Sequence, residues 1–392
     1  MSAFGGKADV NRIHPICPLI ARSGHLLSLG NARHYDYKHT LWQERLTMSR
    51  QMSQEPNTSD IDFIVTWVDS NDPNWQRDFA KHKDGAPAMG HFRDMGTLQY
   101  MFRSFEKFTP WVRKIHFVTY GDTPSWLNIN HPKINIVRDE DILPKDGLPM
   151  FNSSAVELSF GNIYDLSEKF VYFNDDTFMI KPTTEGRFFS GNLPKDFFQV
   201  RILFQDKKFS HLVHEQMSLI ARSFRMKDVF TRRMISKVFN LRYGIVANVR
   251  TFLSLIVSKT LSCFVLYHHP QPHLKINIQE AYHEYSDDIG RIQRQRFREY
   301  DSICDYTFRF WGLINGRFIP YRVRDALYRT ISSKTDIDDA IEQVRKRQYR
   351  FVCFNDAATL TEVEYSYFKE RVGDFLHELL PEPCSFELKD RL

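Results

Sequence analysis

The stretch Lys169-Phe170-Val171-Tyr172-Phe173-Asn174-Asp175-Asp176, residues 169–176, decides the fold. Its apolar part, rich in aromatic and β-branched side chains, is typical of a buried β-strand. An amide and two carboxylates follow at once, and such residues favour turns because their short side chains hydrogen-bond to the neighbouring backbone. We therefore predict a buried strand that ends in an acidic turn.

Other segments combine β-branched and aromatic residues in the same way. They are 62–68 (DFIVTWV), 114–120 (KIHFVTY), 134–137 (INIV) and 351–354 (FVCF). Three of them run directly into turn-forming residues, namely 69–73 (DSNDP), 121–124 (GDTP) and 355–356 (ND). Strands with polar ends are therefore a recurring feature of this chain.

Helical patterns separate these strands. Between 98 and 108 the apolar residues recur at the spacing of one helix face, and Pro110 ends that segment. Residues 154–166 and 362–380 are also predicted to be helical. Because strands alternate with helices, we predict an α/β fold with a mostly parallel sheet, flanking helices and a helical, basic insertion or cap.

The chain divides into four predicted parts. Residues 1–58 lack sustained periodicity, and we interpret them as a disordered extension or an over-long predicted start. Residues 59–200 form the first part of the α/β core, and 201–300 form the basic helical insertion. Residues 301–392 supply a helical segment, the last core strand and the C-terminal helix.

Composition excludes several classes of protein. Hydrophobic residues make up 42% and charged residues 26%, which excludes a disordered chain, and a net charge of +5 falls short of a nucleic-acid binder. The five cysteines are scattered without a CxxC pair, which argues against a zinc site and predicts a reducing compartment. Residues 244–267 are the best candidate for a membrane span, but Arg250 and Lys259 interrupt them, so we predict a buried or surface-lying helix. The N-terminus lacks the pattern of a signal peptide.

The acidic turn is the first candidate site. Ligands of parallel sheets bind beyond the carboxyl ends of the strands, where Asp175 and Asp176 are expected to lie. Paired carboxylates can hold a hard divalent cation that neutralises substrate phosphates. The alternative is turn chemistry alone. A second strand-terminal pair, Asn355-Asp356, and the acidic loop 69–72 favour the site.

Cations and histidines could complete it. Arg93 lies near the start of the helix at 98–108 and Arg103 in its middle. A guanidinium can hold phosphate oxygens with two hydrogen bonds, although a solvated surface charge is the alternative. Residues 268–273 (HHPQPH) predict a stiff loop that presents imidazoles, one of which could act as general base. A surface loop or a metal site are the other interpretations. No GxGxxG, Walker lysine loop or GxSxG elbow is present, so the residues indicate a metal-assisted enzyme acting on a phosphorylated or nucleotide-linked substrate.

Taken together, four ordered blocks resemble the Stealth family of hexose-1-phosphate transferases, which includes bacterial capsular polysaccharide phosphotransferases. The first block is 61–75 (IDFIVTWVDSNDPNW), and the second spans 92–189 with LPMFNSSAVE and LSEKFVYFNDDTF. The third contains HHPQPHLK and RFREYD, and the fourth is 351–357 (FVCFNDA). Met95-Gly96 and the methionine of LPMFNS depart from the family pattern, which leaves the donor sugar open.

The resemblance implies transfer of a sugar-1-phosphate, expected to be N-acetylhexosamine-1-phosphate, from a UDP-sugar to a hydroxyl of a polysaccharide or glycolipid, with release of UMP. It implies Mg²⁺ or Mn²⁺ as cofactor and no nucleic acid as partner. The matching positions are then assigned roles. The catalytic residues would be Asp175, Asp176, His273 and Arg298, with His273 as general base. The substrate would be bound by Trp67, Asp69, Arg93, Arg103 and Asn174. The metal would be bound by Asp176 and Asp356.

Two other functions are compatible with the same residues. A metal-dependent glycosyltransferase would form a glycosidic bond and release UDP, and a non-catalytic module would bind a glycan or nucleotide without turning it over. The family resemblance further implies a cytoplasmic enzyme of capsule or exopolysaccharide synthesis. Its basic segment 222–250 would make peripheral contact with the inner face of the membrane or would cover the donor site.

Overall fold

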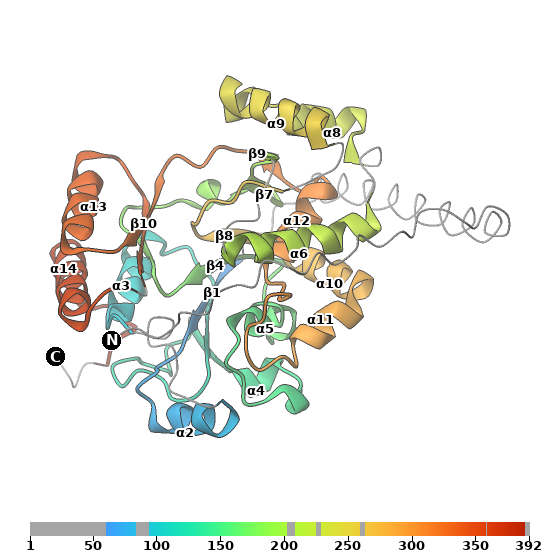
Figure 1. The fold of residues 1–392 in the computed structure, drawn as a ribbon. Helices are drawn as coiled ribbons and strands as arrows, with labels where there is room; N and C mark the ends of the chain where they lie inside the picture. The colour runs from blue at the N-terminus through green and yellow to red at the C-terminus, as the bar shows by residue number, and fades with distance from the viewer. Residues whose placement is uncertain are drawn as a thin grey trace, which may run out of the picture. The chain divides into compact units, whose positions relative to one another are not determined.

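The computed structural model describes residues 60–83, 94–201, 208–224, 229–258, 263–357 and 359–388. The predicted extension 1–58 and Arg93 lie outside these residues. The described part is an α/β structure with a parallel-rich sheet, flanking helices and a helical insertion, which confirms the predicted fold class (Figure 1).

The largest sheet contains the strand on which the prediction rested. Its order is β3-β2-β1-β4-β8, and the first four strands are parallel. Their bounds are β1 (Ile61–Trp67), β2 (Ile115–Thr119), β3 (Ile134–Arg138) and β4 (Lys169–Asn174). Because β4 runs parallel to β1 in the middle of the sheet, the acidic turn lies at the carboxyl edge, as expected for a ligand site.

The His-Pro segment differs from its predicted form. Residues Gln271–Leu274 form the edge strand β8, which pairs antiparallel with β4, whereas the sequence predicted a loop. Proline is tolerated there because an edge strand leaves one side of its backbone without a partner strand. The pairing places His273 opposite Phe170 of β4, with their rings stacked at a centroid separation of 5.3 Å.

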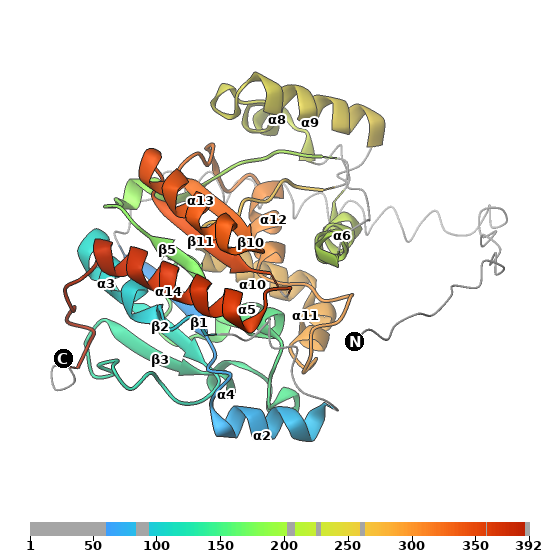
Figure 2. The same cartoon turned by 60° about the vertical axis from the view of Figure 1, so that its left-hand side comes forward.

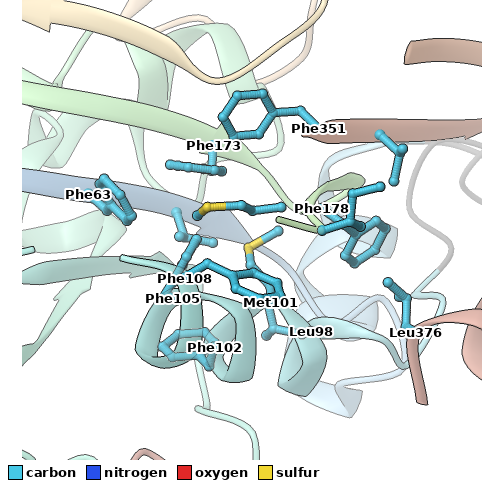
Figure 3. Packing of buried hydrophobic residues seen from close by; sticks show 14 of the residues in the cluster. Phe63, Leu98, Met101, Phe102, Phe105, Phe108, Phe173, Phe178, Phe351 and Leu376 are labelled. Atoms are coloured by element: carbon cyan, nitrogen blue, oxygen red, sulfur yellow. The ribbon is translucent and has the colours of Figure 1, made fainter. Parts of the chain in front are cut away.

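One face of the large sheet packs on α3 (Leu98–Phe108), the predicted amphipathic helix. Side chains alternate along a strand, so Phe63 of β1 and Phe173 of β4 point to this face together. Their ring centroids are 4.8 Å apart, and each lies 5.0 Å from that of Phe105 of α3 (Figure 3). Each buried phenylalanine contributes roughly 1.5–3 kcal/mol by leaving water.

A second sheet continues the chain beyond the acidic turn. It consists of β10 (Ala326–Ile331), β11 (Phe351–Asp356) and β5 (Thr177–Met179), with β11 parallel to β10 and antiparallel to β5. The helices α13 (Lys334–Lys346) and α14 (Glu362–Leu379) lie side by side next to it (Figure 2). The sequence did not predict strand β10. Only Leu327 and Ile331 of this strand are buried, so it lacks a continuous apolar run.

Further short helices accompany the strands of the large sheet along the chain. They are α2 (Pro73–His82), α4 (Asp139–Ile142), α5 (Ser153–Glu157), α10 (Lys275–Glu284), α11 (Ser286–Ile292) and α12 (Tyr306–Ile314). The helix predicted over 154–166 is wrong in length: α5 ends at Glu157, and the short helix η3 (Phe160–Asn162) follows. Gly161 belongs to η3, and a Cβ there would come within 2.8 Å of Ile278, so η3 packs closely against α10.

The remaining elements include the predicted insertion. Three short strands, β6 (Phe189–Ser190), β7 (Leu193–Asp196) and β9 (Ile319–Pro320), form a small sheet. The insertion contains α6 (Lys208–Ser223), α8 (Arg232–Val238), the short helix η5 (Leu241–Tyr243) and α9 (Ile245–Ser258). Among the described residues, none of the helices combines the length and apolar content needed to cross a membrane.

Candidate active site

The acidic turn joins the two larger sheets. Strand β4 ends at Asn174 and β5 begins at Thr177, which leaves Asp175 and Asp176 at the junction. Because β5 pairs with β11, Thr177 lies opposite Cys353. The fold therefore brings the end of β4 next to the last strand of the chain, which the sequence alone placed 177 residues away.

Asp176 is held by donors from three directions. Its Oδ1 lies 3.4 Å from His268 Nε2 and accepts a hydrogen bond of 3.1 Å from the Thr177 hydroxyl. Its Oδ2 accepts a hydrogen bond of 3.2 Å from the Cys353 thiol. Burial by itself would raise the pKa of Asp176, but the hydrogen bond and charge of His268 outweigh it and lower the pKa. Asp176 is therefore an ionised, oriented carboxylate.

His268 and Cys353 complement this charge. Burial would lower the pKa of His268, but the Asp176 carboxylate raises it above its ordinary value. The amide Nδ2 of Asn174 lies 3.2 Å from the same imidazole nitrogen. Burial, followed by the charge of Asp176, raises the pKa of the Cys353 thiol well above its ordinary value, so Cys353 remains a neutral donor.

Asp175 differs from its neighbour although the two are adjacent. Its side chain reaches solvent at the tip of the turn, yet dense surrounding protein and then the charge of Asp176 raise its pKa to about 7. Asp94 and Asp356 raise the pKa of Asp175 further. Four carboxylates therefore share one region, and their mutual repulsion would be relieved by a divalent cation, which prefers oxygen ligands.

A mixed group of side chains at the same place could also hold a metal ion. The ligand atoms of Asp176, His268 and Cys353 lie within 4.8 Å of one another. A neutral thiol is a poor ligand for a hard ion, because metals bind the thiolate. The chemistry of the donors therefore favours the carboxylates rather than this trio for Mg²⁺ or Mn²⁺.

A second polar layer lies beneath the turn, on the face of β4 that carries Phe170 and Tyr172. Carboxylate oxygens of Glu157 and Asp305 lie within 4.8 Å of each other and of Cys304 Sγ. Burial and then the charge of Asp305 raise the pKa of Glu157 to about 8. The Tyr172 hydroxyl donates to Glu157 over 3.3 Å and lies 3.1 Å from the Thr66 hydroxyl. Glu157 is thus a buried carboxyl group that retains its proton near neutral pH.

His273 belongs to this buried layer. Its side chain is 2% exposed, and its Nε2 lies 3.3 Å from Asp305 Oδ2. It is therefore separated from the solvent that Asp175 reaches. The two layers nevertheless interact, because the charge of Asp305 acts on both Glu157 and His268.

A cavity of about 460 Å³ opens beside His268. Its lining combines three arginines with three tyrosines: Arg322, Arg324, Arg329, Tyr267, Tyr328 and Tyr349. Within the described ranges, Arg322 and Arg324 are exposed and have neither a hydrogen bond nor an ion pair with the protein. Arg329, in contrast, donates to Gln343 over 2.6 Å. The cavity is therefore suited to an anionic ligand.

Three other predicted site residues contact neighbouring parts of the protein. Trp67, at the end of β1, stacks on Phe117 at 5.8 Å, and its indole N–H has no acceptor within the described part of the chain. Asp69 accepts a hydrogen bond from the Asn71 amide over 2.8 Å, which is turn chemistry. Arg298 is exposed and donates to the Ser153 hydroxyl at the start of α5.

Arg103 does not belong to the group around the acidic turn. Its side chain is 7% exposed and forms a paired hydrogen bond with Glu387, at 2.7 and 2.8 Å. It also donates to the carbonyls of Leu380 and Pro381. The structure thus gives Arg103 a partner that ties the C-terminal segment to α3, and the predicted contact with substrate phosphate has no geometric support.

Sequence reasoning missed part of the site. It did not single out Glu157, Tyr172 or Asp305, and it chose His273 from the His-Pro segment rather than His268. The alternation along β4 was a usable signal for Tyr172, which shares a face with Asn174. No local signal identified Glu157 or Asp305, because isolated carboxylates on helices are usually solvated.

Comparison with known proteins adds independent information. Residues 91–196 match conserved region 2 of the Stealth proteins, and residues 342–392 match conserved region 4. The chain is 33% identical over 341 residues to the capsular polysaccharide phosphotransferase WcwK of Streptococcus pneumoniae, covering 85% of this chain and 99% of the relative. It is 30% identical over 337 residues to the exopolysaccharide phosphotransferase cps2G of Lactiplantibacillus plantarum, covering 84% and 96%.

Among solved structures, the galactosyltransferase LgtC in complex with donor and acceptor sugar analogs is similar with a TM-score of 0.39. The identity is 11%, and the match covers 82% of this chain and 97% of LgtC.

Proposed function

The chain belongs to the Stealth family, and from this premise we propose that it transfers a hexose-1-phosphate from a UDP-sugar to a hydroxyl of a glycan. The similar phosphotransferases of capsular and exopolysaccharides support the reaction class. In the proposed step, the acceptor oxygen bonds to the β-phosphorus. The bond from that phosphorus to the bridging oxygen breaks, and UMP leaves with the electron pair. The product is a phosphodiester.

This proposal rests on a cluster of four carboxylates around one turn, which are those of Asp94, Asp175, Asp176 and Asp356. A UDP-sugar brings two phosphate charges of the same sign as these carboxylates, so a divalent cation is needed between them. We assign Mg²⁺ or Mn²⁺ to Asp176 and Asp356, because Asp176 is ionised and held in place. When bound, the ion would neutralise the diphosphate and the departing UMP.

Asp175 is the proposed acceptor of the hydroxyl proton. It is the carboxylate at the tip of the turn, and its side chain is exposed, whereas those of Asp176 and Asp356 are only partly exposed. A hydroxyl that approaches from solvent meets Asp175 first. The assignment of His273 as general base stays a prediction, and its burial against Asp305 favours Asp175 instead.

His268 and Asn174 are proposed to position the carboxylates. The Nε2 atom of His268 lies 3.4 Å from Asp176 Oδ1 and 3.2 Å from Asn174 Nδ2, so His268 orients Asp176 directly and Asn174 acts through His268. The arginine-lined cavity beside His268 would hold the anionic part of a substrate. Trp67 and Asp69, with Arg93 and Arg298, keep their predicted roles in holding the nucleotide and the diphosphate.

The decisive experiment follows the β-phosphorus. The purified protein is incubated with Mg²⁺, an oligosaccharide acceptor and a UDP-sugar labelled at the β-phosphate. We expect label in the acceptor product together with UMP. Release of UDP with an unlabelled glycosidic product would contradict the proposal and establish a glycosyltransferase. Binding of the donor without either product would leave a non-catalytic module.

We also propose that the acceptor is a polysaccharide or glycolipid made at the inner face of a membrane, with the basic insertion as the point of membrane contact. Support comes from the basic residues of α8, η5 and α9, among them Arg232, Arg242 and Arg250. The cytoplasmic location of the reaction remains a prediction from the sequence.

A further inference from the structure

Helix α9 turns its apolar side outward. Large apolar side chains on one face are between 49% and 77% exposed: Ile245, Val249, Phe252, Leu253, Ile256 and Val257. We call these six residues the α9 face. Small polar residues of the same helix are buried instead, since Thr251 is 1% and Ser254 8% exposed. A helix on a globular protein normally shows the reverse arrangement.

The contacts of α9 with the rest of the protein are correspondingly polar. The Thr251 hydroxyl accepts a hydrogen bond of 3.3 Å from the Val200 amide. The side chain of Asn248 donates to the carbonyls of Asn240 and Gly244, both over 2.9 Å. These bonds fix the rotation of the helix about its axis, so the outward direction of the α9 face is determined by the fold. Figures 1 and 2 show α8 and α9 next to each other at one margin, away from the large sheet.

The charge of the surrounding segment indicates which kind of partner the α9 face contacts. The segment 229–268 contains no Asp or Glu and six basic residues, which are Arg232, Arg233, Lys237, Arg242, Arg250 and Lys259. Arg232, Arg242 and Arg250 are exposed. An apolar helix face within a basic segment is typical of helices that lie in the interface of an anionic bilayer. A second copy of the chain would bring two uncompensated basic segments together, which disfavours self-association through this face.

We propose that the α9 face docks on the surface of a lipid bilayer that contains anionic lipids, with α9 lying in the membrane plane. The inference rests on the membrane contact proposed above and names the surface that makes it. With 14 residues, α9 is about 21 Å long, which suits an interfacial helix rather than a span.

This orientation also connects the bilayer to the candidate site. Gly244, immediately before α9, adopts φ +87°, and a Cβ there would lie 2.8 Å from a guanidinium nitrogen of Arg322. Arg322 lines the cavity that opens beside His268. The docked enzyme would therefore hold this cavity close to the membrane surface, where a lipid-linked acceptor resides.

The test is sedimentation of the full chain with vesicles of phosphatidylcholine alone, or of phosphatidylcholine and phosphatidylglycerol in equal parts. We expect at least roughly tenfold more protein bound to the anionic vesicles, and weaker binding at high salt because charges are screened. The variant Phe252→Glu/Ile256→Glu should lose this binding. Both positions are more than half exposed, at 54% and 56%, so the variant should melt at the temperature of the parent.

The matched control is Val363→Glu on α14, where valine is 70% exposed outside the α9 face. It should sediment like the parent. Equal vesicle binding by parent and double variant would overturn the proposal. So would a dimer in light scattering that becomes monomeric in the double variant while neither protein binds vesicles. Labelled transfer to a soluble acceptor should be the same in both proteins, so failure of docking is distinguishable from failure of the proposed reaction.

Discussion

His268 Nε2 lies 3.4 Å from Asp176 Oδ1, although 92 residues separate the two in the chain. The contact depends on the chain path after the insertion, which returns to the large sheet just before β8 and places His268 above the acidic turn. It pairs a carboxylate of lowered pKa with an imidazole of raised pKa. Each of these two groups therefore favours the charged form of the other.

Replacing His268 by glutamine should weaken catalysis through Asp176. His268 contacts a proposed metal ligand and orients it, and loss of such a contact typically lowers activity about 10- to 100-fold. We expect a fall of this size and a rise in the Mg²⁺ concentration that gives the half-maximal rate. Steady-state rates over a Mg²⁺ titration measure both effects. His283→Gln, exposed on α10, is the control and should change neither. An unchanged Mg²⁺ requirement in His268→Gln would argue against a positioning role.

The two aspartates of the turn should be separable by their metal dependence. Asp176→Asn should abolish activity at low Mg²⁺ and recover partly at high Mg²⁺, because a proposed ligand is lost. Asp175→Asn should lower kcat by at least about 100-fold at every Mg²⁺ concentration, because a proton acceptor is lost. Chelation of the parent by EDTA should stop transfer, and Mg²⁺ or Mn²⁺ should restore it. Identical metal profiles for the two variants would refute the division of roles.

Glu157 should make the stability of the protein depend on pH. Its pKa is about 8 in the folded protein against an ordinary value of 4.5, so the folded state retains a proton that the unfolded chain releases. The resulting stabilisation is present below pH 4.5 and is lost as the pH rises towards 8. The stability of Glu157→Gln relative to that of the parent should therefore be higher at pH 8 than at pH 5. Thermal melting at both pH values measures this gain.

The control for this measurement is Glu140→Gln, an exposed position on α4. It should leave the difference between the two pH values unchanged. A Glu157→Gln variant whose melting temperature shifts equally at both pH values would show that the glutamate does not hold an extra proton in the folded protein.

Arg103 should be a determinant of stability rather than of donor binding. The Arg103–Glu387 pair is almost fully buried, with side chains 7% and 5% exposed. Arg103→Gln leaves a buried carboxylate without its partner and should cost about 3 kcal/mol of unfolding free energy. The double variant Arg103→Gln/Glu387→Gln should be less destabilised than the single one. Chemical denaturation measures these costs. If Arg103→Gln instead raised the KM for the UDP-sugar and left stability unchanged, the predicted contact of Arg103 with the substrate would be supported.

The sequence determined the elements whose signals are local. A continuous run of aromatic and β-branched residues specified β4, and helical spacing specified α3, because each of these patterns depends only on which residues must face the core. Turn chemistry placed Asp175 and Asp176 at a strand end for the same reason. The four ordered blocks then identified the family before any contact was known.

Only the tertiary structure decided which distant groups meet. Glu157, His273 and Asp305 come from α5, β8 and the start of α12, and nothing in their local sequence marks them as neighbours. The strand β8 forms because β4 offers an unpaired edge, which the His-Pro pattern cannot reveal. Likewise, the sequence indicated an apolar helix over α9, but its outward rotation depends on hydrogen bonds of Thr251 and Asn248 to partners elsewhere in the backbone. Local propensity determines whether a segment forms a helix or a strand. Long-range packing determines which residues that segment contacts and which of its faces is exposed.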